Sequence, residues 1–298
     1  MNNIIEISNL SKYYGSVRAL HDLNLSVNEG EIFGFLGPNG SGKTTTLRIL
    51  IDYLRSSSGT CKIFGMDTVS QSTEIKKDIG YLPGNIQLYK TMKAIDLLKY
   101  FANLRGVSDW NYIENIANRL DSDIGIKIGT MSKGNQQKIG LIQAMMHKPR
   151  LLILDEPTSG LDPLVQERFF EMIDEIRTDG KTVFMSSHVL SQVERICNRA
   201  GILKSGELVA TENIDSLRSK RAQEVEIHFT KPVPPDEFLS VEGINDVKFN
   251  NLILQCTVIG SPDKLIKLAA KYTVDKLITH EPHLEETFLS FYENTEQT

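Results

Sequence analysis

A glycine-rich octapeptide follows directly on a short apolar run, and this pairing constrains the fold more than any other feature. Residues 32–36 read IFGFL, and residues 37–44 read GPNGSGKT, which fits the pattern G-x-x-x-x-G-K-[ST]. A strand, a glycine-rich loop and a helix in this order place several backbone N–H donors around one anion. The segment therefore predicts a phosphate-binding loop between a strand and a helix.

The residue types in this loop indicate separate roles. Lys43 is expected to reach the β and γ oxygens of a nucleotide, and the hydroxyl of Thr44 is expected to bind Mg²⁺. The alternative is a glycine loop with a chance lysine. The candidate binding residues are Gly37, Pro38, Asn39, Gly40, Ser41, Gly42, Lys43, Thr44 and Thr45.

A second segment, LLILDE at residues 151–156, supplies carboxylates. Four apolar residues that end in acids predict a buried strand of a parallel sheet, with the acids at its carboxyl end. Asp155 then suits Mg²⁺ coordination, and Glu156 suits a general base that polarises the attacking water. Taken alone, a core strand that ends in an acidic turn fits this run equally well, but the phosphate loop favours the metal site.

Residues 130–138, TMSKGNQQK, open a helix that is expected to run toward His147. A serine and a glycine at a helix start offer hydroxyl and N–H donors, and so form a second phosphate-seeking site. Alone, Ser132 would be an ordinary helix cap. Its position upstream of Asp155 favours the phosphate-binding interpretation.

In this order the three segments closely resemble those of the nucleotide-binding subunit of ATP-binding cassette (ABC) transporters, over residues 1 to about 218. Residues 159–163, SGLDP, resemble the family's D-loop, which contains Asp162. His188 resembles the switch histidine, and Tyr14 resembles the aromatic that stacks on adenine. The resemblance implies an α/β fold of the P-loop NTPase ABC-cassette type, with a mixed-sheet core, an antiparallel β subdomain and a helical subdomain.

The resemblance also implies ATP and Mg²⁺ as cofactors and a head-to-tail dimer of ATPase subunits, either a homodimer or a heterodimer. It implies catalytic roles for Lys43, Glu156 and His188, and metal binding by Thr44 and Asp155. The further residues that it assigns to nucleotide binding are Ser132, Gly134, Gln136 and Asp162.

Two positions depart from the family pattern. The signature is usually LSGGQ, whereas Lys133 here adds a cation near the expected γ-phosphate. Gly84 stands where the Q-loop normally carries glutamine. Because glycine reaches positive φ without steric cost, we expect a mobile loop. A restored glutamine is expected to raise the turnover of the isolated subunit or to weaken its stimulation by a permease. Met131, Lys133 and Asn135 surround the retained Ser132, Gly134 and Gln136.

Composition narrows the possible partners. The net charge is −5 and no basic stripe is visible, which argues against a nucleic-acid partner. The three cysteines lack C-x-x-C spacing, so neither a disulfide framework nor a zinc site is indicated. No apolar run approaches the ~18–20 residues of a membrane span, and no secretory signal opens the chain. A pore would therefore belong to another polypeptide.

Periodicity divides the chain into an ABC ATPase domain, residues 1–218, and a small α+β accessory or regulatory domain, residues 222–298. The first segment alternates as antiparallel strands do, and residues 91–120 have helical periodicity. After the charged residues 218–221, we expect strands at 224–229, 246–249, 252–256 and 274–279. Helices are expected at 262–271 and 284–292, with a hairpin turn at Asn250 and Asn251.

Residues 284–289, LEETFL, resemble the close of cassettes from ABC-2-type exporters. The resemblance implies an ATP-hydrolysing exporter subunit at the cytoplasmic face of the membrane, bound to a separate ABC-2-type permease, with an antibiotic, peptide or lipid-like cargo. A soluble ABC-type ATPase without transport is the alternative, although such proteins usually carry two cassettes or a long coiled coil. A GTP-dependent switch is disfavoured, because the sequence contains no guanine-reading Asn-Lys-x-Asp motif. A nucleotide-binding regulator without turnover is disfavoured by the presence of Glu156 and His188.

Overall fold

The computed structural model describes residues 2–219 and 222–280. The chain divides into two compact units, Met1–Thr211 and Glu212–Thr298, and each has its own hydrophobic core. This division falls inside strand β10 (Glu207–Asn213), whereas the charge pattern places the linker at residues 218–221.

An antiparallel sheet opens the first unit. Its strand order is β2-β1-β4-β5, in which β1 is Asn3–Tyr14, β2 is Val17–Asn28, β4 is Ser58–Ile63 and β5 is Met66–Asp67. Ile5 pairs with Val27 and Ile7 with Leu25, so the alternating apolar residues face the core together. The antiparallel strands expected at the start of the chain are confirmed.

A six-stranded sheet carries the predicted motifs, in the order β10-β9-β3-β8-β7-β6. Strands β9, β3, β8, β7 and β6 run parallel to their neighbours. The strands expected at 32–36 and within 151–156 are confirmed, and their carboxyl ends meet at one edge with that of the parallel strand between them, β8. The bounds are β3 Ile32–Leu36, β6 Ile79–Leu82, β7 Leu151–Asp155, β8 Thr182–Ser187 and β9 Arg199–Lys204.

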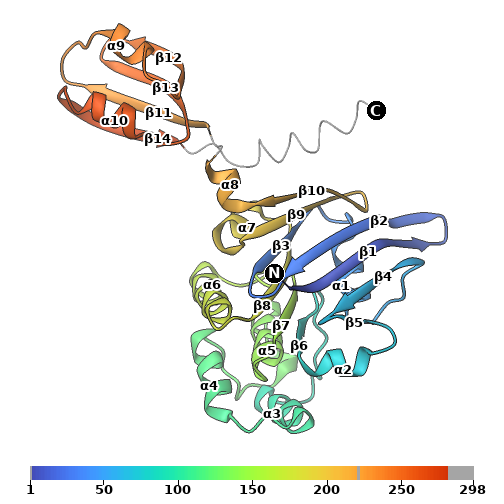
Figure 1. Cartoon of the computed structure of the whole chain (residues 1–298). Coiled ribbons are helices and arrows are strands. Elements are labelled where there is room, and N and C mark those ends of the chain that lie inside the picture. Colours follow the sequence, from blue (N-terminus) through green and yellow to red (C-terminus); the bar gives the residue numbers. More distant parts are fainter. Residues whose placement is uncertain (1, 220–221, 281–298) are drawn as a thin grey trace. The chain divides into compact units, whose positions relative to one another are not determined.

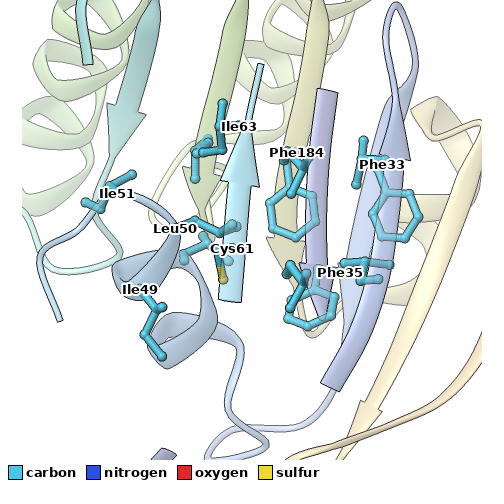
Figure 2. Packing of buried hydrophobic residues seen from close by; sticks show 14 of the residues in the cluster. Phe33, Phe35, Ile49, Leu50, Ile51, Cys61, Ile63 and Phe184 are labelled. Atoms are coloured by element: carbon cyan, nitrogen blue, oxygen red, sulfur yellow. The ribbon is translucent and has the colours of Figure 1, made fainter. Parts of the chain in front are cut away.

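One hydrophobic cluster joins the two sheets to the helix that follows the glycine-rich loop (Figure 2). Phe184 on β8 lies between two phenylalanines of β3, with ring centroids 5.7 Å from Phe33 and 5.4 Å from Phe35. Leu50 from the helix and Ile63 from β4 are fully buried in the same cluster. This packing fixes the position of β3, and with it the start of the loop.

The helices of the first unit include the pair expected within residues 91–120. Helix α3 ends at Gly106, whose φ of 67° suits glycine, and α4 begins after its Asp109 cap. Both helices contact α5 (Figure 1). The bounds are α1 Lys43–Leu50, α2 Ser72–Lys77, α3 Ala94–Arg105, α4 Trp110–Arg119, η1 Ile128–Thr130, α5 Lys133–Met145, α6 Pro163–Thr178 and α7 Leu190–Ile196.

After the end of β10, the second unit contains α8 (Ile214–Ser219) and then β11-α9-β12-β13-α10-β14, with the antiparallel sheet order β12-β13-β11-β14. This is the ferredoxin-like arrangement. The expected hairpin is confirmed, but its turn lies one residue later than expected, because Asn250 pairs with Ile253 across Asn251 and Leu252. The expected helix at 284–292 lies outside the described residues. The bounds are β11 Ala222–Phe229, α9 Pro235–Leu239, β12 Ile244–Asn250, β13 Ile253–Ile259, α10 Asp263–Ala269 and β14 Val274–His280.

Within residues 2–219 and 222–280, every helix is too short or too polar to cross a membrane.

Candidate nucleotide-binding site

The glycine-rich loop joins β3 to α1 at the carboxyl edge of the six-stranded sheet. Gly40 and Gly42 have φ values of 82° and 109°, which other residues rarely adopt. A Cβ atom at Gly37 would lie 2.4 Å from the carbonyl oxygen of Leu203, so a side chain does not fit there. The first N–H groups of α1 have no acceptor within the helix. The loop therefore presents backbone donors to an anion, as the sequence predicts.

Lys43 is the first residue of α1, and its side chain folds back over the loop. Its Nζ donates to the carbonyl oxygens of Gly37, at 2.6 Å, and Pro38, at 3.1 Å. The same ammonium lies 3.5 Å from Oε1 of Glu156, and Lys43 is only 5% exposed. The cation is therefore held between the loop and the predicted general base.

Thr44 and Asp155 meet where α1 begins and β7 ends. Thr44 Oγ1 donates to Asp155 Oδ2 at 2.8 Å, and Ser186 Oγ donates to Asp155 Oδ1 at 2.6 Å. Asp155 is 1% exposed, so its carboxylate is held by both hydroxyls in a buried position. Hydroxyl and carboxylate oxygens are the hard ligands that Mg²⁺ prefers. The donor set at this point fits the predicted metal.

Glu156 has a left-handed backbone, with a φ of 50°. This conformation is costly for a residue other than glycine, and it persists only where surrounding contacts impose it. Its N–H donates to Ser186 Oγ at 3.0 Å, and its Oε2 lies 2.8 Å from His188 Nδ1. Its Oε1 is buried and faces Lys43 without a hydrogen bond from the described residues. The left-handed turn thus aims the carboxylate between Lys43 and His188.

The segment that resembles the family signature lies apart from the loop, at the start of α5. Ser132 caps this helix by accepting the N–H of Asn135 at 3.2 Å. Gly134 packs against the residues after Glu156, because a Cβ atom there would lie 2.2 Å from Gly160 O. Gln136 donates to Met131 O at 3.1 Å, so its amide is engaged within its own segment.

Counted from Met131, Asn135 rather than Gln136 occupies the fifth position of the signature. Asn135 is therefore the residue that corresponds to the glutamine of the family pentapeptide. The predicted nucleotide contact of Gln136 has no support from this spacing.

Two further candidates lie at the ends of elements. Tyr14 closes β1 and is 48% exposed, with Lys12 Nζ 5.2 Å from its ring centroid. Asp162 caps α6, because its Oδ1 accepts the N–H of Val165 at 3.0 Å. Within the part of the chain that the structure describes, neither the Tyr14 nor the Asp162 side chain forms a hydrogen bond or ion pair with Lys43 or Asp155.

Gly84 lies beside the metal-binding candidates, and its φ is not positive, so this backbone conformation does not itself require glycine. The physical reason for a small residue there is space, because a Cβ atom at Gly84 would lie 2.9 Å from Asp155 Oδ2. Burial, together with the nearby Asp155 carboxylate, raises the pKa of Tyr81 to about 12, so this phenol stays neutral. A cavity of about 760 Å³ lies between residues 84–88, Lys133 and Gly160.

Two residues that the sequence did not single out hold the backbone of Glu156. Ser186 accepts its N–H, and Gln137 Nε2 donates to the carbonyl oxygens of Glu156, at 3.3 Å, and Pro157, at 3.1 Å. Ser186 sits in the apolar segment TVFMSS and reads as an ordinary strand residue. Only the pairing of β7 with β8, which sets Asp155 opposite Ser186, identifies it.

Known proteins share both the sequence and the fold. Residues 20–159 match the ABC transporter family. The chain is 39% identical to an uncharacterised ABC transporter ATP-binding protein of Methanocaldococcus jannaschii, over 73% of this chain and 80% of that protein. It is 31% identical to the bacitracin transport ATP-binding protein BcrA of Bacillus licheniformis, over 97% of both chains. The linearmycin resistance ATP-binding protein LnrL of Bacillus subtilis is 31% identical, over 96% of this chain and 97% of that protein.

Solved structures agree with these relatives. An ATP-binding subunit of an ABC transporter is 28% identical, with a TM-score of 0.66, over 72% of this chain and 92% of that chain. A dimeric bacterial ABC transporter cassette is 25% identical, also with a TM-score of 0.66, over 70% of this chain and 98% of that chain. The expected α/β cassette fold is therefore confirmed. The chain belongs to the ABC transporter family, as an ATP-binding subunit that hydrolyses ATP.

Proposed function

We propose that this ATPase energises export through a separate transmembrane permease of the ABC-2 type, bound at the cytoplasmic face of the membrane. The observation that carries the ATPase chemistry is the position of the Glu156 carboxylate between the side chains of Lys43 and His188. The export assignment is supported by BcrA and LnrL, which match this chain over nearly its whole length, including the second unit. Bacitracin transport by BcrA and linearmycin resistance through LnrL favour an antibiotic, peptide or lipid-like cargo for this chain.

Thr44 and Asp155 would hold Mg²⁺, since their oxygens already lie together at the end of the glycine-rich loop. When bound, the ion neutralises charge on the β and γ phosphates. Lys43 exchanges its carbonyl acceptors for phosphate oxygens, and the N–H groups of the loop bind the same anion. Glu156 accepts a proton from the attacking water, while His188 holds the other carboxylate oxygen.

A second copy of the subunit completes each site in this proposal. Ser132 and Gly134 lie at the start of α5, and Gly134 packs on Gly160 rather than on the glycine-rich loop. A head-to-tail dimer places these donors against ATP held by the partner's loop. Such a dimer holds two ATP molecules, and either a homodimer or a heterodimer of related subunits satisfies this geometry.

The chain is proposed to work as a nucleotide-binding domain, residues 1–218, with an accessory domain, residues 222–298. Tyr14 is exposed at the end of β1 and offers a face to adenine. The second domain has its own core around Phe238 and Leu254, which suits a module that regulates the dimer or its partner.

The test is recovery of the tagged full-length chain from native membranes in mild detergent, followed by identification of the proteins bound to it. The expected result is an ABC-2-type permease whose presence raises ATPase activity. ATP hydrolysis by a chain that is recovered without any membrane partner would instead favour the uncoupled ATPase.

A further inference from the structure

The amide of Gln137 joins two parts of the molecule that act on different nucleotides in the proposed dimer. Gln137 lies on α5, one turn after Ser132, and is 6% exposed. Its Nε2 donates to Glu156 O and to Pro157 O. The signature segment is thus tied by hydrogen bonds to the backbone of the catalytic glutamate of its own chain.

A second contact makes this connection rigid. Gly134 and Gly160 touch so closely that a Cβ atom on Gly134 would lie 2.2 Å from Gly160 O. Within the same turn, Ser159 N–H donates to Glu156 O at 3.1 Å. Because packed contacts of this kind do not deform continuously, a displacement of α5 moves residues 156–160 with it.

The conformation of Glu156 is sensitive to such a displacement. Its φ of 50° is held from the N–H side by Ser186 and from the carbonyl side by Gln137 and Ser159. Left-handed backbone in a residue other than glycine requires contacts of this kind. Loss of the Gln137 bonds leaves the Glu156 carbonyl held by Ser159 alone and the Pro157 carbonyl without this donor, which weakens the hold on the turn that keeps the carboxylate beside Lys43 and His188.

We propose that Gln137 is a positioning residue through which Ser132, on binding the partner's nucleotide, sets the orientation of Glu156 in its own site. The inference rests on the proposed dimer. It adds a physical link that couples hydrolysis at the two sites: the helix that binds one nucleotide also supports the base that activates the water attacking the other nucleotide.

The test compares three variants of the full-length chain with wild type. Gln137→Leu removes both donated bonds and is expected to lower kcat about tenfold and to bring the Hill coefficient for ATP to 1. ATP affinity at the glycine-rich loop, measured in EDTA, should change by less than about twofold, since the loop is untouched. The matched control is Gln166→Leu, which removes a part-buried amide bond to Leu161 O and should retain wild-type cooperativity.

Gln137→Glu provides a readout that a purely structural role would not move. A buried carboxylate facing two carbonyl oxygens repels them, and both burial and the carbonyl dipoles raise its pKa above the ordinary value of about 4.3. Once protonated, the carboxyl donates one hydrogen bond again. The kcat of Gln137→Glu, relative to that of wild type, should therefore rise as the pH is lowered from about 8 to 6. Gln137→Leu should show no such recovery.

The outcomes separate this inference from the proposed function. If Glu156→Gln forms no ATP-dependent dimer, the proposed dimer itself fails. If that dimer forms but Gln137→Leu hydrolyses ATP with wild-type kcat and cooperativity, the role of Gln137 is overturned. Loss of ATP binding and of folded structure in Gln137→Leu, with no pH recovery in Gln137→Glu, would also overturn it, because Gln137 would then serve folding alone.

Discussion

The hydroxyl of Ser186 donates to Oδ1 of Asp155 across 2.6 Å, from a strand position directly opposite it in the parallel sheet. The Ser186 hydroxyl oxygen also accepts the N–H of Glu156 at 3.0 Å. Ser186 is fully buried, so water does not replace either bond. One small side chain therefore orients both the carboxylate proposed for the metal and the backbone of the base.

Ser186→Ala should reduce kcat by about tenfold or more and destabilise the fold by roughly 1–3 kcal/mol, because a buried carboxylate oxygen loses its donor. ATPase assays and urea unfolding measure the two effects. Ser11→Ala is the matched control, since Ser11 is buried and likewise donates to Asp22 Oδ1 and accepts the Asp22 N–H. Equal kcat losses in both variants would show that the effect of Ser186 is not specific to the site.

Glu156→Gln should keep ATP binding and reduce turnover at least about 100-fold, which is within the range for loss of a general base. The variant should accumulate an ATP-dependent dimer, visible by size exclusion with light scattering. Wild-type turnover in this variant would remove Glu156 from the proton-transfer step.

Lys43→Ala should lose most nucleotide affinity, because it removes the charge that faces the β and γ phosphates. Equilibrium binding of a fluorescent ATP analogue measures the loss, and a thermal melt establishes that the variant is folded. Unchanged affinity in folded protein would contradict the assignment of the loop.

Gly84→Ala should lower turnover by about tenfold to 100-fold, because the added methyl group displaces the Asp155 carboxylate from Thr44. The same clash argues against the expectation that a restored glutamine at position 84 raises the turnover of the isolated subunit. Gly125→Ala is the matched control, since its Cβ atom would also meet a carboxylate, 3.2 Å from Asp123 Oδ1, on an exposed loop. Higher turnover in Gly84→Ala would contradict the proposed clash, and higher turnover in Gly84→Gln would support the expectation for a restored glutamine.

A chain truncated after Leu217 should still bind ATP, because all the residues proposed for nucleotide binding precede that point and β10 is retained. The binding affinity should lie within about threefold of the full-length value. Isothermal titration calorimetry on both proteins provides the measurement. A folded truncated chain that binds no ATP would contradict the domain boundary.

Sequence reasoning found the parts of the site that carry their own local signal. The glycine-rich loop and the apolar strand before Asp155 combine residue type with spacing, and both were located correctly. Ser186 and Gln137 have no such signal, because their partners are set by strand pairing and helix packing. The short helix α9 was not expected, because adjacent prolines are more typical of a turn, although Pro235 fits the first turn of a helix.

The place of β3 in its sheet has a consequence for synthesis of the chain. This strand carries the glycine-rich loop, yet its two neighbours are β8 and β9, which pair Ile32 with Val183 and Phe33 with Arg199. Such distant pairing delays folding, since loop closure must precede the stabilising contacts. We therefore expect β3 and its glycine-rich loop to reach their native arrangement only after β8 and β9 have been synthesised, and the apolar residues of β3 to lack these neighbours until then.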